Sequence, residues 1–127
     1  MRSFNFVIAL TVLLAWKGCE NGNFRFKGTV YRTDSGIRKP LDGIAVTVVR
    51  EYLETSYGRP WRKTYSHEGT ARTDVKGHYE IHGITPYAEK HTYYLVFEDP
   101  SYRTDTVKIR KKGSYVQSTY DHEMKPN

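Results

Sequence analysis

The stretch Thr73-Asp74-Val75-Lys76-Gly77-His78-Tyr79-Glu80-Ile81 decides the fold of this chain. Residues 74–77 predict a tight turn, in which the aspartate caps its own backbone and the glycine supplies a positive φ. After the turn, Tyr79 and Ile81 alternate with polar residues at 78, 80 and 82, the pattern of a β-strand with one buried face. The stretch therefore predicts a turn that leads into a half-buried strand.

Similar alternation recurs on both sides of this turn. Phe24, Phe26 and Val30 face one side of a first strand, and residues 92–98 are apolar on both faces, as in a central strand. Strands are expected at residues 24–31, 44–50, 70–73, 78–82, 92–98, 105–110 and 114–124, and no segment has helical periodicity. Seven short strands separated by turn signals predict an all-β fold, a single antiparallel β-sandwich.

Length and composition agree with this fold class. A chain of 127 residues allows one domain, and a hydrophobic content of 38% with a mean hydropathy of −0.69 allows only a small core. Tyrosine is abundant, with 11 residues against 5 phenylalanines, and it favours a pleated, half-buried surface.

The N-terminus has the features of a signal peptide. Arg2 is followed by the apolar run Phe6–Trp16, which is too short to span a bilayer but has the length of a signal-peptide core. Lys17-Gly18-Cys19 then resembles a bacterial lipobox, the signal in which the cysteine is acylated and becomes the mature N-terminus. Trp16 and Lys17 stand where that signal usually has leucine and a small residue.

This resemblance implies the domain organisation of the chain. We expect a lipoprotein signal peptide at residues 1–18, a lipidated Cys19 with a linker at 19–23, and the β-sandwich domain at 24–124. The protein would be exported and lipid-anchored to the outer membrane of a gram-negative bacterium, either periplasmic or surface-exposed. The alternative is an ordinary secretory signal followed by an incidental cysteine.

The charge balance argues against a nucleic-acid partner. The formal net charge is +6, and removal of residues 1–18 leaves 18 basic and 14 acidic residues, a net charge of +4. The basic residues are scattered apart from residues 59–63 and 110–112, and neither cluster has the density of a nucleic-acid arm.

Two blocks of residues carry a resemblance to a known family. One combines Gly28-x-Val30 with Pro40-Leu41-Asp42-Gly43-Ile44-x-Val46-x-Val48, and the other is Thr73-Asp74-x-x-Gly77-x-Tyr79-x-Ile81. Together they resemble carboxypeptidase regulatory-like domains, the prealbumin-like sandwiches that also include the collagen-binding B-type repeats of surface proteins. The resemblance covers about residues 24–124. It implies an accessory, binding or assembly role without a cofactor. A narrower, weaker likeness is to small lipoproteins associated with radical-SAM maturation loci.

A candidate binding surface lies between the second and third expected strands. Residues 51–68 lose the strand pattern and form the longest irregular segment that we expect. Aromatic rings in it suit sugar rings or a protein partner, and its cations suit acidic groups. The candidate contact residues are Tyr52, Tyr57, Arg59, Trp61, Arg62 and Tyr65. The alternative is that these aromatic rings only cover the edge of the sandwich.

Other candidate sites are weaker. His78, Glu80 and His82 share one strand face and offer imidazole and carboxylate ligands, but the outer two are too far apart to hold one metal ion comfortably. A Lys-to-Asp isopeptide bond, as the B-type family forms, would use Lys27, Asp121 and either Glu80 or Glu98. Lys27, however, alternates with Phe26 and should point to solvent.

The sequence therefore favours a non-catalytic lipoprotein of the cell envelope that binds a protein or glycan partner or assists assembly. No Ser, His and Asp spacing predicts a catalytic triad, so we expect no enzymatic activity and no cofactor. An enzyme or metal-binding protein with a site around His78, Glu80 and His82 is one alternative, and a purely structural spacer domain is another.

Overall fold

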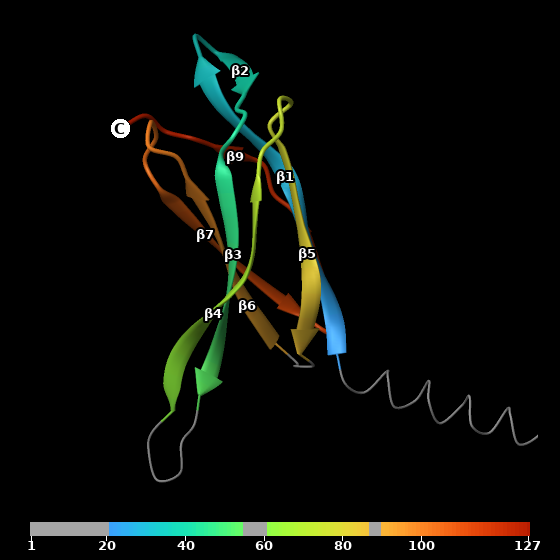
Figure 1. The fold of residues 1–127 in the computed structure, drawn as a ribbon. Coiled ribbons are helices and arrows are strands. Elements are labelled where there is room, and N and C mark those ends of the chain that lie inside the picture. Colours follow the sequence, from blue (N-terminus) through green and yellow to red (C-terminus); the bar gives the residue numbers. More distant parts are fainter. Residues whose placement is uncertain (1–20, 55–60, 87–89) are drawn as a thin grey trace, which may run out of the picture.

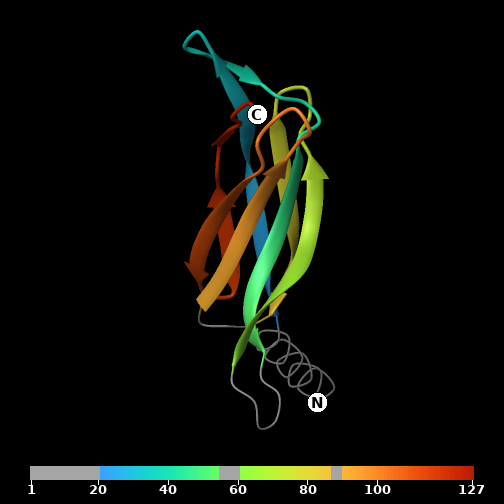
Figure 2. The same ribbon diagram turned by 90° about the vertical axis from the view of Figure 1, so that its left-hand side faces the viewer.

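The computed structural model describes residues 21–54, 61–86 and 90–127, which form two β-sheets packed face to face (Figures 1 and 2). The strands are β1 (Asn21–Asp34), β2 (Ile37–Pro40), β3 (Ala45–Glu54), β4 (Arg62–Arg72), β5 (His78–Pro86), β6 (Lys90–Glu98), β7 (Asp105–Lys112), β8 (Tyr115–Thr119) and β9 (His122–Glu123). The predicted all-β sandwich is confirmed. Within the described ranges, no helix is long and apolar enough to cross a membrane.

The two sheets differ in how their strands pair. One sheet has four strands in the order β4-β3-β6-β7, all antiparallel. In the other sheet, β1 pairs antiparallel with β2 and β5, and parallel with β8 and β9. The parallel pairs differ from the expected antiparallel arrangement, because strand alternation defines the buried face and not the direction of the neighbour.

The turn that opens β5 has the predicted chemistry. The Asp74 carboxylate accepts hydrogen bonds from the amides of Lys76 at 2.9 Å and His78 at 3.0 Å. Gly77 has a φ of 77° and donates its amide to the Asp74 carbonyl at 2.9 Å. The Gly77 carbonyl also accepts the Val30 amide at 2.8 Å, so this turn ties β5 to β1.

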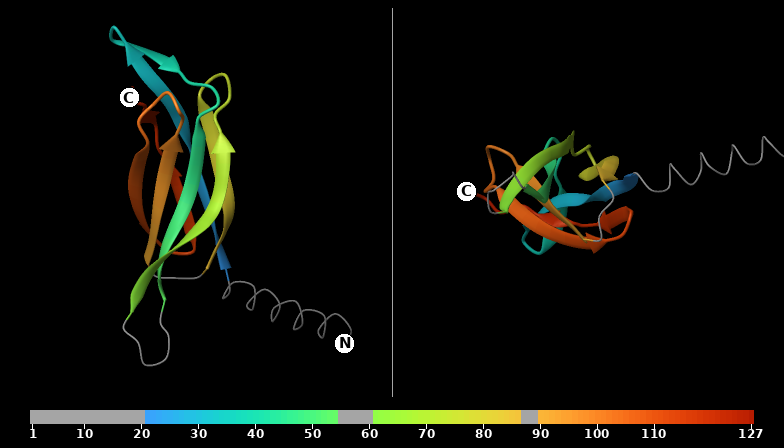
Figure 3. Two further views of the ribbon diagram at one scale, coloured as in Figure 1. Left: turned by 60° about the vertical axis from the view of Figure 1, so that its left-hand side comes forward. Right: turned by 90° about the horizontal axis from the view of Figure 1, so that it is seen from below.

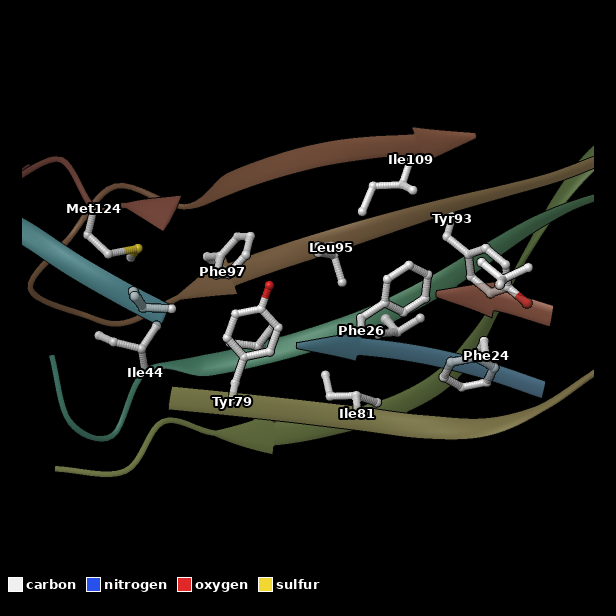
Figure 4. Close-up of a cluster of buried hydrophobic side chains, with 14 residues drawn as sticks. Phe24, Phe26, Ile44, Tyr79, Ile81, Tyr93, Leu95, Phe97, Ile109 and Met124 are labelled. Carbon is white, nitrogen blue, oxygen red and sulfur yellow. The ribbon is translucent and has the colours of Figure 1, made fainter. Parts of the chain in front are cut away.

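The core lies between the sheets and combines aliphatic side chains with five aromatic rings (Figure 4). The rings of Phe24, Phe26 and Tyr93 contact one another with centroids 5.2–5.8 Å apart. Tyr79 and Ile81, the inward residues of β5, are 4% and 5% exposed, as the alternation predicts. Among the residues that the structure describes, the core side chains lie between Phe24 and Met124.

The expected last strand, at residues 114–124, is two strands separated by a crossing. At Tyr120 and Asp121 the chain passes over Gly28 of β1, where any β-carbon would overlap the Tyr120 carbonyl oxygen. The Tyr79 hydroxyl donates to that carbonyl at 2.6 Å, and the Asp121 carboxylate accepts the Thr29 amide at 2.9 Å. These contacts replace the regular hydrogen bonds between strands, so β8 ends before the crossing and β9 begins after it.

The expectation that residues 51–68 are irregular is wrong for the part of that segment that the structure describes. β3 continues to Glu54 and β4 begins at Arg62, so both sides form a hairpin that extends beyond the rest of the sandwich (Figure 3). Both faces of this extension contact solvent, because no second sheet covers it. The usual alternation of apolar and polar residues is therefore absent, and the sequence pattern did not predict these strands.

The sandwich has two ends with different elements. We call the end where β1, β4, β6 and β8 begin and β3, β5 and β7 finish the N-terminal end (Figure 1). The opposite end, which holds the 74–77 turn and the connection between β6 and β7, is called the turn end.

Candidate functional site on the hairpin of β3 and β4

The candidate contact residues separate onto different parts of the hairpin. Tyr65 and Trp61 are 57% and 69% exposed. Tyr65 lies on the outer face of the four-stranded sheet opposite Glu51, and Trp61 directly precedes β4. Tyr52 lies on the other face, where the Arg50 guanidinium stands 4.9 Å from its ring centroid. Arg62 pairs with Glu54 at 3.2 Å. Tyr57 and Arg59 lie outside the described residues.

The outer face brings Tyr65 together with residues that are distant in sequence. Its ring packs edge-on against Tyr94 of β6, with centroids 6.0 Å apart. The Glu51 carboxylate accepts hydrogen bonds from the Tyr94 hydroxyl at 3.1 Å and the Tyr65 hydroxyl at 3.4 Å. The Lys63 ammonium stands 3.8 Å from Glu51. We call these four residues the tyrosine cluster.

The Glu51 carboxylate at the centre of the tyrosine cluster is largely shielded from solvent, and its hydrogen bonds hold the two tyrosine hydroxyls. The Glu51 side chain is 13% exposed. Loss of solvation, and then the hydrogen bond to Glu51, raises the pKa of Tyr94. The phenol therefore keeps its proton and remains a donor at neutral pH. The rings are held by their hydroxyl groups, which leaves the Tyr65 ring open to a ligand.

Sequence reasoning identified Tyr65 but missed Tyr94 and Glu51. Tyr94 belongs to a central strand whose two faces are both apolar, so nothing local marked it as a surface residue. Glu51 pairs opposite Tyr65 across β3 and β4 and opposite Thr92 across β3 and β6. That neighbourhood requires the register of three strands, which the sequence alone did not provide.

The tyrosine cluster is suited to binding. Exposed aromatic rings stack on the apolar faces of sugars or on a partner's side chains, and the fixed carboxylate accepts hydrogen bonds from hydroxyl or amide groups. Lys108, 5.9 Å from the Tyr94 ring centroid, adds a cation beside it.

The rival residues lie on the outer face of the other sheet. His78, Glu80 and His82 are exposed on β5, and Glu80 forms an ion pair with Arg25 at 2.7 Å. An open hollow of about 490 Å³ includes His78 and Glu80 among its lining residues but not His82. Over the part of the chain that the structure describes, no group of three or more metal-ligating side chains is arranged to hold an ion.

The isopeptide residues do not meet in the core. Lys27 is exposed, as its alternation with Phe26 predicts, and it pairs opposite Glu80 on the solvent side of the sheet. Asp121 lines the same hollow but its carboxylate accepts the Thr29 amide. Glu98 is exposed at the turn end. The buried acid that would assist such a bond is therefore absent from this described group of residues.

No protein-family model and no curated protein sequence matches the chain. Among solved structures, it is similar to 3-chlorocatechol 1,2-dioxygenase from Rhodococcus opacus 1CP, with 13% identity and a TM-score of 0.55. The C-terminal domain of the shaft pilin SpaA from Lactobacillus rhamnosus GG matches with 15% identity and a TM-score of 0.44. A minor pilin from Streptococcus agalactiae matches with 18% identity and a TM-score of 0.40.

These similarities concern the fold alone. The dioxygenase match covers 83% of this chain and 60% of the dioxygenase, so the chain spans less than two thirds of that enzyme. The match covers 84% of this chain and 98% of the SpaA domain, and 85% of this chain and 46% of the minor pilin. A shared sandwich at such identities says nothing about activity, because one fold carries many functions.

Proposed function

We propose that this chain is a non-catalytic interaction module of the cell envelope, a carboxypeptidase regulatory-like domain that binds a glycan or protein partner. The contact surface is the tyrosine cluster together with Trp61. The observation that carries the proposal is the Tyr65 ring, which is 57% exposed although Glu51 and Tyr94 hold it in one position. A fixed, exposed aromatic ring loses little conformational entropy on binding.

The same proposal includes export and a lipid anchor. The signal-like segment at residues 1–18 and the lipobox-like Cys19 support attachment to the outer membrane, with the domain periplasmic or surface-exposed. Intact mass of the protein from its native host tests this part. A mass that starts at Cys19 with added acyl chains is expected, and an unmodified mature chain would remove the anchor.

Trp61 provides a direct test of binding. The chain contains two tryptophans, Trp16 and Trp61, so the domain of residues 21–127 reports only on Trp61. We expect its emission to change on titration with oligosaccharides released from envelope glycans, and Tyr65→Ala to abolish the change. Val75→Ala is the control, because Val75 is 75% exposed at the turn end. A response that survives Tyr65→Ala would place the contact elsewhere.

A protein partner is tested in the host. A photo-cross-linking amino acid at position 61 should capture an envelope protein, and Tyr65→Ala should reduce the capture while Val75→Ala does not. If neither glycan nor protein binding depends on Tyr65, the domain is a spacer or acts through the face of His78. Loss of an activity in His82→Ala without loss of fold would favour the latter.

A further inference from the structure

The N-terminal end carries an unusual concentration of positive charge where β6 begins and β7 finishes. Lys90 pairs directly opposite Lys112, His91 opposite Lys111, and Thr92 opposite Arg110. Like charges directly opposite each other destabilise a strand pair. This arrangement therefore weakens the edge of the sheet, and folding alone gives no reason for it.

These cations surround a hollow and lack acidic partners in the described ranges. The hollow has a volume of about 570 Å³ and is lined by Lys90, His91, Thr92, Arg110, Lys111 and Lys112. Among the residues that the structure describes, no carboxylate lies within 4.0 Å of the four Lys and Arg side chains. His91 is turned inward and hydrogen-bonds to the Gly113 carbonyl at 2.7 Å. The charged groups at 90, 110, 111 and 112 are therefore exposed to solvent.

Exposed apolar side chains occur at the same end. Ile84 of β5 and Tyr115 of β8 are 66% and 72% exposed, and both pair opposite Asn23 of β1, so they lie in one row across the sheet. Leu53, 59% exposed, and Trp61 extend from the hairpin on the other sheet. Both sheets therefore present apolar groups at the end that carries the cations of β6 and β7.

The turn end has cations too, but several of them are neutralised. Arg32 and Lys39 both contact the Asp34 carboxylate, at 3.5 Å and 3.1 Å. Lys125 pairs with Glu123 at 3.1 Å. At the N-terminal end, Arg62 and Lys63 of the hairpin are likewise paired with Glu54 and Glu51. The cluster around β6 and β7 has no such partner among the described residues, and this cluster calls for an anionic partner.

We propose that the N-terminal end docks on the anionic headgroups of a lipid bilayer. Lysine and arginine attract such a surface, while tryptophan, tyrosine and isolated aliphatic side chains favour the boundary between headgroups and acyl chains. β1 begins at this end with Asn21, two residues after Cys19. If Cys19 is acylated, as proposed above, that tether spans about 7 Å and holds this end against the membrane.

The folded domain thereby supplies a second membrane-binding signal. Acyl chains on Cys19 would hold the chain at the bilayer but leave the domain free to turn, and a basic patch in addition would fix its orientation. Docking would place the tyrosine cluster, on the outer face of the same sheet, close to the membrane surface. The orientation of the domain rests on the proposed lipid anchor. Binding of the domain to the bilayer does not, and it is measured on protein that lacks Cys19.

The test uses residues 21–127, which contain every core side chain that the structure describes and lack Cys19. Co-sedimentation with vesicles of phosphatidylcholine alone is compared with vesicles that also contain phosphatidylglycerol. We expect binding only to the anionic vesicles, with salt weakening it. Lys111→Glu/Lys112→Glu should lower the partition coefficient at least roughly 30-fold, because each lost basic residue near an anionic surface removes about a fivefold factor and the new carboxylates add repulsion.

Lys76→Glu/Arg103→Glu is the matched control. It changes the net charge by the same amount, but both residues are exposed at the turn end, so binding should stay near wild type. Equal losses in the two double variants would overturn the proposal, since only net charge would then matter. Equal binding to neutral vesicles would overturn it as well. If the first variant misfolds by circular dichroism, Lys90→Gln/Lys112→Gln replaces it.

A soluble polyanion separates the bilayer from other anionic partners. Heparin that displaces the wild-type domain only at high concentration agrees with a membrane surface, whereas heparin binding that is tighter than vesicle binding would contradict it. Ile84→Ser/Tyr115→Ser should also weaken vesicle binding, which a purely electrostatic polyanion site would not require. Tyr65→Ala should leave vesicle binding intact, so failure here and failure of the proposed glycan or protein surface are distinguishable.

Discussion

The turn end and the N-terminal end of this sandwich differ in how well their residues stabilise the local structure. At the turn end, the Thr73 hydroxyl donates to the Leu41 carbonyl at 2.6 Å and accepts the Ile44 amide at 2.9 Å, and Asp74 caps the turn. At the N-terminal end, Lys90 faces Lys112 across the sheet and Trp61 is 69% exposed. The residues named at the turn end stabilise the local structure. The facing lysines and the exposed tryptophan at the N-terminal end do not.

This difference indicates where fold and function are encoded. Sequences specify a structure when local choices agree with it, and proteins break that agreement mainly at sites kept for another purpose. Substitution of Asp74 or Gly77 in the turn should therefore lower stability. Substitution of the exposed residues Lys90, Lys112 and Trp61 at the N-terminal end should change stability little and binding more.

The largest effect is expected for Ile81→Asp. Ile81 is 5% exposed on β5, and its side chain packs over Gly69 of β4, so an aspartate would bury an unpaired carboxylate between the sheets. We expect a loss of at least about 4 kcal/mol in the free energy of unfolding. His82→Asp, one residue further on the exposed face, is the control and should melt near the wild-type temperature. Similar melting of both variants would contradict the assignment of this strand.

Gly77→Ala should have the next largest effect. Gly77 combines a φ of 77° with a position where a β-carbon would overlap the Val30 carbonyl oxygen. Gly36→Ala is the matched control, because Gly36 has a φ of 81° but no atom within 4 Å of its β-carbon position. We expect urea unfolding to show losses of about 3 kcal/mol and about 1 kcal/mol respectively, the second being backbone strain alone. Equal losses would show that the close contact with β1 is absent in solution.

The parts of the fold that the sequence predicted are those where one face of a strand is buried. Tyr79 and Ile81, like Phe24 and Phe26, alternate with exposed residues, and all four lie in the core. β2 was missed because all four of its residues are exposed. The parallel pairing of β8 with β1 was missed because pairing direction depends on contacts distant in sequence, such as Asn23 with Tyr115.

The candidate site was only half predictable, for a related reason. Trp61 and Tyr65 stood out as aromatic residues in a polar segment, and the structure places both on exposed positions. Their partners Glu51 and Tyr94 come together through the registers of β3 with β4 and β6, which no local pattern records. Residues 110–112 stood out as a basic cluster, but Lys90 could not be assigned to it, since Lys90 and Lys112 are 22 positions apart in the sequence and adjacent only in the sheet.

A smaller, pH-dependent effect should distinguish the turn end. Hydrogen bonds from the His78 and Lys76 amides hold the pKa of Asp74 below its ordinary value of 3.8. A carboxyl whose pKa is lower in the folded state stabilises the fold above its unfolded pKa, and this stabilisation is lost as pH falls through the folded pKa. Between about pH 6 and about pH 2, the difference in unfolding free energy between wild type and Asp74→Ala should therefore shrink.

The difference between the two proteins is the useful quantity, because other carboxyl groups titrate in the same range. The pKa values of Asp34, Glu54 and Glu123 are also lowered by hydrogen bonds and neighbouring cations or hydroxyl groups, and they contribute to both proteins alike. A difference that stays constant with pH would show that Asp74 is not hydrogen-bonded as an anion.

The smallest effect on stability should have the opposite sign. Lys112→Glu would place an acid opposite Lys90 and replace a repulsive cross-strand pair with an attractive one, so we expect a gain of about 0.3 kcal/mol in chemical unfolding. Lys108→Glu is the control on the same strand. It removes a cation from the Tyr94 ring, and it should be neutral or slightly destabilising. If Lys112→Glu stabilises the domain and also weakens its binding to anionic vesicles, the lysine opposes folding and serves binding. Destabilisation by Lys112→Glu would mean that this cation supports the fold, and the contrast between the two ends would then fail at the place where it is sharpest.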